Sequence, residues 1–339
     1  MGNVDIGIDL GTTSVLIYID GKGIVLKEPS VVAVNSQTGE TIAIGIEAAR
    51  MIGKAPSKID VICPLADGVI ADYDMCERMV KYFLKKVCEN SVVKPRVAIC
   101  VPSGITGVES RAVIEAAVSS GARKVFLVEE PVAAAIGAGI DLTRANGNIV
   151  LDIGGGTTDV AVISLNGIVT KASVKVAGNK FDDAIIKYVR DSYNILIGSH
   201  TAESIKIGVG SVAPRLVECE MEFKGRNLLS GMPQKRIIKR SDVREVLMEP
   251  IVQILQTVRS VIERTPPELV GDLLNNGIVL TGGGAKLNGL PELVKRVLKI
   301  EAYLAPYSEE CVAIGTGKLF DYTDKMSDGI IDSILYPHK

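Results

Sequence analysis

The chain is poor in the residues that build metal and redox centres. Its 339 residues include 2 histidines and 6 cysteines, and no two cysteines stand in a CxxC pair. A zinc site is therefore not expected, because such sites draw their ligands from closely spaced Cys and His. The scattered thiols and the lack of an N-terminal secretory segment predict a protein of the reducing cytoplasm.

Tryptophan, long apolar runs and a strong excess of charge are absent as well. No apolar run approaches the ~18 residues of a membrane-spanning helix. The net charge of −2 gives no overall attraction to nucleic acid, so we expect no nucleic-acid partner. What the chain does have is 47% hydrophobic residues and 34 glycines. At this length we expect two domains with sizeable cores.

Two copies of one pattern stand far apart in the chain. Residues 4–21 read VDIGIDLGTTSVLIYIDG, and residues 149–167 read IVLDIGGGTTDVAVISLNG. In each copy an apolar run ends in an aspartate (Asp9 or Asp152), a Gly/Thr turn follows, and a second apolar run comes after it. This pattern predicts a β-hairpin. The turn residues are Gly11, Thr12 and Thr13 in the first copy and Gly154, Gly155, Gly156 and Thr157 in the second.

The matched turns predict a phosphate site. Glycine lets the backbone approach a ligand closely, and successive amides form a concavity that binds anions. A carboxylate at the end of the preceding strand is placed to hold Mg²⁺ through water, which is the role we expect for Asp9 and Asp152. Hairpin capping by the side chain is an alternative for either aspartate alone, but it does not explain their matched placement. The duplication predicts two halves that clamp one phosphate chain.

The remaining pattern is α/β, with the order βββαβαβα expected in each half and a mixed sheet flanked by helices. We expect domain I at residues 1–140 plus 316–339, with a small subdomain at about 31–66, and domain II at 141–315, with a small subdomain at about 178–244. Apolar periodicity predicts helices at 74–88, 109–120, 132–139, 179–193, 201–207 and 241–263.

Three glycine motifs, DLGTT (9–13), DIGGGTT (152–158) and LTGGGA (280–285), occur together with EEPVAAAIGAG (129–139) and TPPELVGDLLNNGIVLTGGGA (265–285). In these stretches the sequence resembles the actin-like ATPase superfamily and, within it, the MreB family of bacterial actin homologues, over nearly the whole chain. The resemblance implies an actin-like ATPase fold, two duplicated mixed-sheet domains around a central nucleotide cleft, with ATP and Mg²⁺ as cofactors.

The resemblance also implies roles for individual residues. It assigns the third glycine turn, which comprises Gly282, Gly283, Gly284 and Ala285, to adenosine. It places Glu203 and Lys206 against the ribose and base, whereas their i, i+3 spacing alone favours a surface ion pair.

For catalysis, Glu130 or Glu129 can orient the attacking water, since both follow a predicted strand and precede a helix. The family pattern selects Glu130, the carboxylate directly before Pro131, and leaves Glu129 structural. Thr157 is expected to position the same water or the γ-phosphate.

Four residues depart from the usual family pattern: Ser14, Asp159, Lys171 and Gly208. Asp159 stands where Glu is usual. Lys171 stands where a small hydroxyl residue is usual, and a lysine there can add an ion pair or alter contacts between domains. None of the four is expected to touch Glu130, Thr157, Asp9 or Asp152, so ATP hydrolysis is expected to survive, at a rate the sequence does not set.

The resemblance implies slow ATP hydrolysis coupled to self-assembly into protofilaments that determine cell shape. It leaves open contact with the inner membrane surface and with membrane-bound shape or cell-wall proteins. Local support is small: residues 89–94 offer only Val92 and Val93 for insertion, and the helical spacing at 330–335 predicts a terminal helix packed on its own domain. The alternatives are a small-molecule kinase or slow non-polymerising ATPase of the same fold, and a nucleotide-holding protein without turnover.

Overall fold

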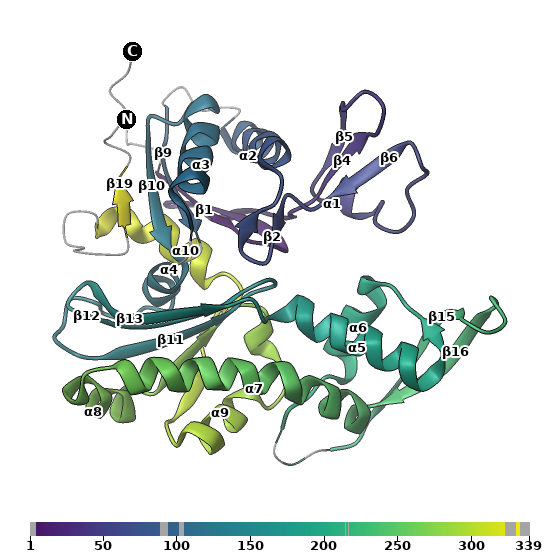
Figure 1. Cartoon of the computed structure of the whole chain (residues 1–339). Coiled ribbons are helices and arrows are strands. Elements are labelled where there is room, and N and C mark those ends of the chain that lie inside the picture. The colour runs from purple at the N-terminus through teal and green to yellow at the C-terminus, as the bar shows by residue number, and fades with distance from the viewer. Residues whose placement is uncertain are drawn as a thin grey trace.

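The computed structural model describes residues 5–88, 94–101, 105–213, 215, 217–322 and the backbone of 330–332. Two large sheets lie one above the other in Figure 1. The upper one, here the N-terminal sheet, contains β1 (Asp5–Leu10), β2 (Ser14–Ile19), β3 (Gly23–Pro29), β9 (Arg96–Val101), β10 (Lys124–Glu129) and β19 (Ile330–Asp332). The lower one, the C-terminal sheet, contains β11 (Asn148–Ile153), β12 (Thr158–Ser164), β13 (Gly167–Val174), β17 (Ile278–Thr281) and β18 (Ala302–Leu304).

The two sheets repeat one topology. The strand order is β19-β10-β9-β1-β2-β3 in the first and β13-β12-β11-β17-β18 in the second. In each sheet the first three strands form an antiparallel meander, and the first strand then pairs in parallel with a strand that arrives through helical connections. A fifth strand pairs in parallel with the fourth. The predicted duplication and the mixed α/β fold class are confirmed.

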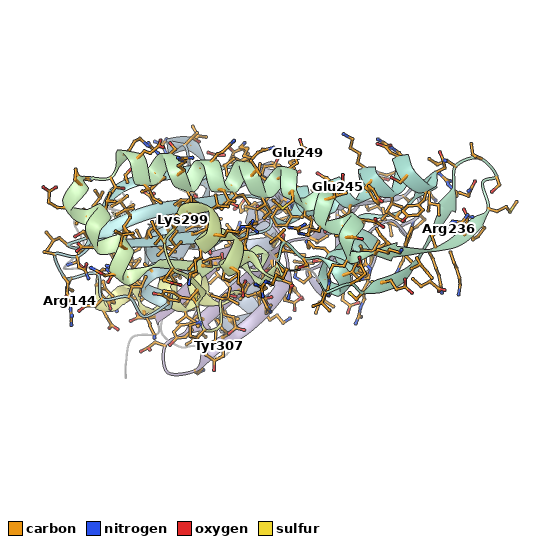
Figure 2. The ribbon with its side chains drawn as sticks, turned by 90° about the horizontal axis from the view of Figure 1, so that it is seen from below. Arg144, Arg236, Glu245, Glu249, Lys299 and Tyr307 are labelled. Carbon is orange, nitrogen blue, oxygen red and sulfur yellow. The ribbon has the colours of Figure 1, made fainter. Side chains whose placement is uncertain are left out.

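Helices cover the outer faces of both sheets (Figure 1). The predicted helices are all present, with ends within two residues of the predicted ones: α2 (Tyr73–Cys88), α3 (Gly107–Ser119), α4 (Glu130–Gly137), α5 (Gly178–Tyr193), α6 (Ser199–Val209) and α7 (Arg240–Arg264). Further helices are α1 (Ile46–Ala49), α8 (Pro267–Asn276), α9 (Leu290–Leu298) and α10 (Cys311–Lys318), with 3-10 turns at Gly284–Lys286 and Leu319–Asp321. The exposed Glu245 and Glu249 lie on the outer side of α7 (Figure 2).

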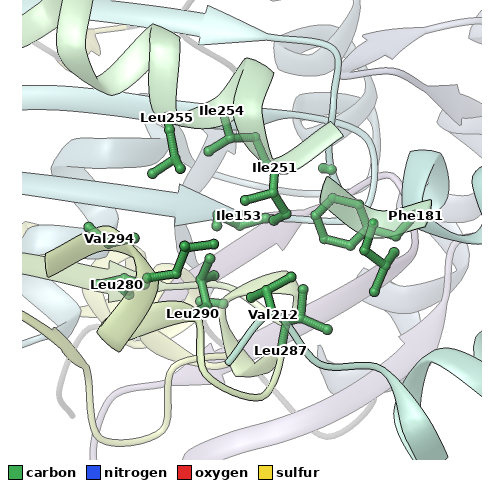
Figure 3. Packing of buried hydrophobic residues seen from close by; sticks show 14 of the residues in the cluster. Ile153, Phe181, Val212, Ile251, Ile254, Leu255, Leu280, Leu287, Leu290 and Val294 are labelled. Carbon is green, nitrogen blue, oxygen red and sulfur yellow. The ribbon is translucent and has the colours of Figure 1, made fainter. Parts of the chain in front are cut away.

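The core of the C-terminal half shows why these elements pack as they do. The apolar residues of α7 recur with helical spacing, so Ile251, Ile254 and Leu255 all face the sheet (Figure 3). They meet Phe181 of α5 and Leu280 of β17, all buried. Aliphatic side chains fill this interior, as a chain without tryptophan requires.

Two small sheets extend from the large ones on the same side of the molecule (Figure 1). One consists of β4 (Val32–Asn35), β5 (Thr41–Ile44) and β6 (Ile59–Ile62); the other consists of β14 (Ile195–Leu196), β15 (Glu220–Asn227) and β16 (Pro233–Lys239). A two-stranded hairpin, β7 (Leu65–Ala66) and β8 (Val69–Ile70), follows the first of them. The exposed Arg236 lies midway along β16, opposite Phe223 of β15 (Figure 2).

Helices α4 and α10 cross between the two large sheets, and glycines allow their backbones to touch. A Cβ atom on Gly137 would collide with the carbonyl oxygen of Cys311, and one on Gly315 would collide with that of Ala133. Only glycine permits so close an approach. The surrounding cluster includes Ala98 from the N-terminal sheet and Val150 from the C-terminal sheet, so this helix pair joins the two halves.

The C-terminal tail differs from its prediction. Residues Ile330–Asp332 form strand β19, antiparallel to β10, instead of the start of a helix. Strand pairing with an open sheet edge outweighs the helical spacing of a short apolar run. Residues 89–93 and 333–339 lie outside the described part of the chain. No helix among the described residues is long and apolar enough to cross a membrane.

The crossing gives a stability prediction. Gly315→Ala should lower the free energy of unfolding by about 1–3 kcal/mol, because the new methyl group overpacks the contact with α4. Gly271→Ala is the matched control, since Gly271 also lies inside a helix but a Cβ there meets no atom within 4 Å. That control should be neutral or stabilising by up to about 1 kcal/mol. Equal effects of the two changes in chemical denaturation would contradict a tight crossing.

Candidate functional site

The two predicted phosphate turns face each other across the gap between the sheets. A Cβ on Gly155 would collide with Oγ1 of Thr13, and one on Gly156 would lie 2.7 Å from Oγ1 of Thr12. The turns are also closed in the same way: Gly11 N donates to the carbonyl oxygen of Ser14 at 3.2 Å, and Gly154 N donates to that of Thr157 at 3.0 Å. Residues almost 150 positions apart are thus brought together as matched loops.

The turn at Asp67 and Gly68, which the sequence did not lead us to expect, lies over the two phosphate turns. Gly68 N lies 3.3 Å from Oγ1 of Thr12 and donates a hydrogen bond to it. Asp67, with a positive φ of 49°, lies beside Gly156: a Cβ on Gly156 would be 3.1 Å from the Cα of Asp67. The Asp-Gly dipeptide between two short apolar runs is a hairpin signal that was available in the sequence. The sequence did not show that this hairpin lies over the phosphate turns.

Four carboxylates gather beneath these turns. Asp152 and Asp159 are directly opposite each other on β11 and β12, and both are buried. Glu130, the first residue of α4, shares a hydrogen bond with Asp159 and feels the charges of Asp152 and Asp9. The predicted residues Asp9, Asp152 and Glu130 therefore do come together. The expectation that Asp159 touches none of them is wrong, because β12 places it opposite Asp152 and beside Glu130.

The electrostatics of this acidic cluster are unfavourable without a cation. Burial, reinforced by the charge of Asp152, raises the pKa of Asp9 from 3.8 to about 8. Burial also raises the pKa of Asp152 to about 7, although a hydrogen bond donated by Thr281 Oγ1 to its Oδ1 at 2.6 Å opposes the shift. Burial and the neighbouring carboxylates, Asp159 foremost, raise the pKa of Glu130 well above its ordinary value.

The donor set fits a hydrated magnesium ion. Within the part of the chain that the structure describes, no three His, Cys, Asp or Glu side chains are arranged to ligate a metal together. Mg²⁺ commonly keeps several waters and uses one or two carboxylates. Asp9 near the end of β1 and Asp152 near the end of β11 supply two such carboxylates, one from each large sheet, and each raises the energy of ionising the other in a buried position.

Glu129 and Glu130 have separate environments. Both carboxylate oxygens of Glu129 accept hydrogen bonds from Lys171 Nζ, at 2.7 and 2.6 Å. Glu130 instead lies with the acidic cluster. Of the two glutamates, only Glu130 lies among the carboxylates next to the phosphate turns, and its role as the water-orienting residue stays a prediction.

On the other side of the second turn, Lys206 of α6 reaches toward the start of α5. Its Nζ donates to Oδ2 of Asp182 at 2.9 Å and to the carbonyl oxygen of Gly178 at 3.2 Å. Gly178 N in turn donates to the carbonyl oxygen of Gly154 at 3.1 Å. The ion-pair partner of Lys206 is thus Asp182, while Glu203 stays exposed on the same helix, free to face a ligand.

The third glycine turn lies beside the second hairpin, because β17 pairs in parallel with β11. Two of its glycines have a packing reason: a Cβ on Gly282 or Gly284 would collide with Ile153. Gly283 is exposed, and Ala285 is buried. The turn therefore lies next to the second phosphate turn, and its predicted contact with adenosine stays a prediction.

The sequence profile of the MreB/Mbl protein family matches residues 3–328. The chain belongs to this family. It is 49% identical over 323 residues to the cell shape-determining protein Mbl of Bacillus subtilis (strain 168), covering 95% of this chain and 97% of that protein. It is 47% identical over 326 residues to the cell shape-determining protein MreB of Escherichia coli (strain K12), covering 94% of each.

Solved structures agree with this MreB/Mbl assignment. The crystal structure of MreB5 of Spiroplasma citri bound to ADP has a TM-score of 0.90 and 40% identity, covering 95% of this chain and 97% of that one. The MamK double helical filament has a TM-score of 0.81 at 20% identity over 94% of this chain and 99% of that one, which shows the shared fold. The predicted actin-like fold is confirmed.

The acidic cluster gives a pH prediction. Since the folded-state pKa of Asp9 is raised from 3.8 to about 8, the cluster is most favourable at low pH, and its contribution to stability is lost as pH rises toward 8. Asp9→Asn should therefore raise Tm at pH 8 by roughly 2 °C or more, and by less at pH 5, which lies only a little above the unfolded-state pKa of 3.8 where the loss begins. The measurement is thermal unfolding without nucleotide or divalent metal.

The control for this comparison is Asp20→Asn, an exposed aspartate just beyond the same hairpin. Its charge is solvated, so the change should alter Tm little at either pH. A gain in Tm for Asp9→Asn that is the same at pH 5 and pH 8 would argue against charge repulsion in the cluster.

Proposed function

We propose that this MreB/Mbl protein binds ATP between its two halves, hydrolyses it slowly and polymerises into filaments that determine cell shape. The observation that carries the proposal is the approach of Gly155 and Gly156 to Thr13 and Thr12, with the carboxylates below. A similar protein, MreB5 of Spiroplasma citri, has been solved bound to ADP and to AMPPNP. The curated relatives are named as cell shape-determining proteins.

In this proposal the two turns hold the phosphate chain through backbone amides. Asp9 and Asp152 hold the waters of a magnesium ion, which neutralises phosphate charge when it is bound. Lys206 and Glu203 face the ribose and base, and the third glycine turn supports the adenosine. Entry of the cation and phosphates replaces the mutual repulsion of the carboxylates by attraction.

Hydrolysis requires a group that orients water in line with the γ-phosphate. Glu130 begins α4 at the carboxyl end of β10, and its hydrogen bond with Asp159 fixes its orientation. Thr157 is buried at the end of the second turn, and in this proposal it holds the same water or a phosphate oxygen. Slow turnover follows if the water is positioned well only in the closed arrangement.

Self-assembly follows from rotation of the two halves about α4 and α10. We propose domain I as residues 1–140 plus 316–339 and domain II as 141–315, with the nucleotide fixing the angle between them. A fixed angle makes one end of a subunit complementary to the other end of the next. Such head-to-tail contacts do not close and so give filaments.

The catalytic assignment predicts that Glu130→Gln lowers single-turnover ATP hydrolysis on the order of 10²-fold while ATP affinity persists. Binding persists because the phosphate turns act through their backbones. The control is Glu115→Gln, an exposed carboxylate on α3. A larger loss of hydrolysis in Glu129→Gln than in Glu130→Gln would reverse the assignment of the two residues.

The assembly assignment predicts sedimentable filaments above a critical concentration with Mg-ATP or a non-hydrolysable analogue. Gly155→Val should reduce both nucleotide binding and assembly, because its side chain occupies the space of Thr13. Gly271→Val, at an open position in α8, is the control for nucleotide binding. Wild-type protein that stays monomeric by light scattering at roughly tens of micromolar with Mg-ATP would count against a filament protein.

A further inference from the structure

One ion pair joins the two halves beside the candidate site. Lys171 lies on β13 in the C-terminal sheet, where it is paired with Ala161 of β12, and Glu129 is the last residue of β10 in the N-terminal sheet. Lys171 Nζ is 2.6 and 2.7 Å from the two carboxylate oxygens. The Glu129 side chain is only 15% exposed, and that of Lys171 is 37% exposed. Partial burial reduces the screening that weakens most surface pairs.

The other ion pairs of the described residues that are similarly buried do not join the two halves. Arg96–Asp5 and Lys206–Asp182 each lie within one half of the molecule. The pair between Lys27 of β3 and Glu309 does connect β3 with the segment before α10, but its side chains are 47% and 38% exposed. Among the described residues, the Lys171–Glu129 pair is therefore the better placed of the two to hold the halves together.

The anchoring of each partner determines what the pair can do. Arg264 Nη2 of α7 donates to the carbonyl oxygen of Lys171 at 3.2 Å, which ties this part of β13 to the long helix of the C-terminal half. Glu129 immediately precedes Glu130 and α4, the helix that crosses α10. A bond from β13 to the start of α4 thus resists rotation about the helix crossing.

We propose that Lys171 is a latch residue, which holds the two halves closed through its ion pair with Glu129 and so slows the exit of nucleotide from the cleft. Only the claim that nucleotide exit is slowed rests on the proposed function; the claim that the ion pair holds the halves closed does not. In this view Lys171 touches no substrate. It acts as a positioning residue: closure brings the two phosphate turns together, and Glu129, held by Lys171, fixes the strand end that presents Glu130.

The first experiment measures closure without any nucleotide. Cys63 is exposed at the end of the first small sheet, and Leu229, 84% exposed, lies in the β15–β16 turn of the second. Spin labels on Cys63 and on a cysteine introduced by Leu229→Cys report the separation of the two small sheets. The half-buried Cys88 and Cys219 are first changed to Ser.

In that background, Lys171→Met removes the charge and keeps the length of the side chain. It should lengthen and broaden the distance distribution. The control is Lys295→Met, which removes an exposed ion pair with Glu301 that lies within the C-terminal half. A distribution that Lys171→Met leaves unchanged would overturn the latch.

The second experiment measures dissociation of a fluorescent ADP analogue by stopped flow. Lys171→Met and Glu129→Gln should each speed dissociation about 5-fold, a size usual for a partly screened ion pair. The double variant should be no faster than the single ones, because both remove the same interaction. The charge swap Lys171→Glu/Glu129→Lys should restore at least half of the effect.

These outcomes separate a latch from a general loss of stability. Additive effects of the two single changes, or a swap that restores nothing, would contradict a pairwise interaction. Higher salt should speed dissociation in the wild type more than in Lys171→Met, since only the wild type has the pair to screen. If the wild type does not bind the ADP analogue, the proposed function fails, and the distance measurement still decides whether Lys171 closes the halves.

Discussion

Close contact between two helix backbones holds this molecule together. Gly137 and Gly315 let α4 and α10 cross at backbone contact between the sheets, and neither position has room for a Cβ atom. The crossing fixes the distance between the sheets. That distance decides whether the two glycine turns can reach a common ligand. The geometry of the cleft therefore depends on the α4–α10 crossing.

The same geometry concentrates negative charge. Each half ends a strand in an aspartate beneath a glycine turn, and bringing the halves together brings the aspartates together. Glu130 arrives on α4 itself, so it cannot be withdrawn from the cluster without moving the crossing. The fold thus places like charges close together in a buried position, which raises the pKa values of Asp9, Asp152 and Glu130. The close carboxylates lower the stability of the fold at neutral pH and at the same time form a site suited to a cation.

Much of the fold was predictable from the sequence because the pattern is duplicated and strongly periodic. The two hairpins, the helix positions and the mixed sheets followed from local alternation and spacing. Contacts between distant segments did not. Lys206 pairs with Asp182 of another helix, the Asp67 turn covers the first phosphate turn, and the tail adds a strand in place of a helix. Each of these depends on which surfaces the folded chain brings together.

The candidate site shows the same limit. The residue types of the site were visible in the motifs, and Asp9, Asp152 and Glu130 lie together as expected. That Asp159 lies beside Glu130 could not be seen, because the sequence does not show that the start of α4 packs against the second hairpin. The packing of Gly282 and Gly284 against Ile153 was equally hidden. The roles of these residues in binding and catalysis stay predictions.

The two hairpins are copies in topology but not in chemistry. Across the strand pair, Asp9 faces Leu16 in the first hairpin, whereas Asp152 faces a second carboxylate, Asp159, in the other. A pocket with true twofold symmetry would offer a bound molecule two equivalent orientations. The extra carboxylate makes the two sides of the cleft unequal. The duplicated halves thus place unequal charge on the two sides of the cleft, and an elongated ligand would meet a different electrostatic environment at each end.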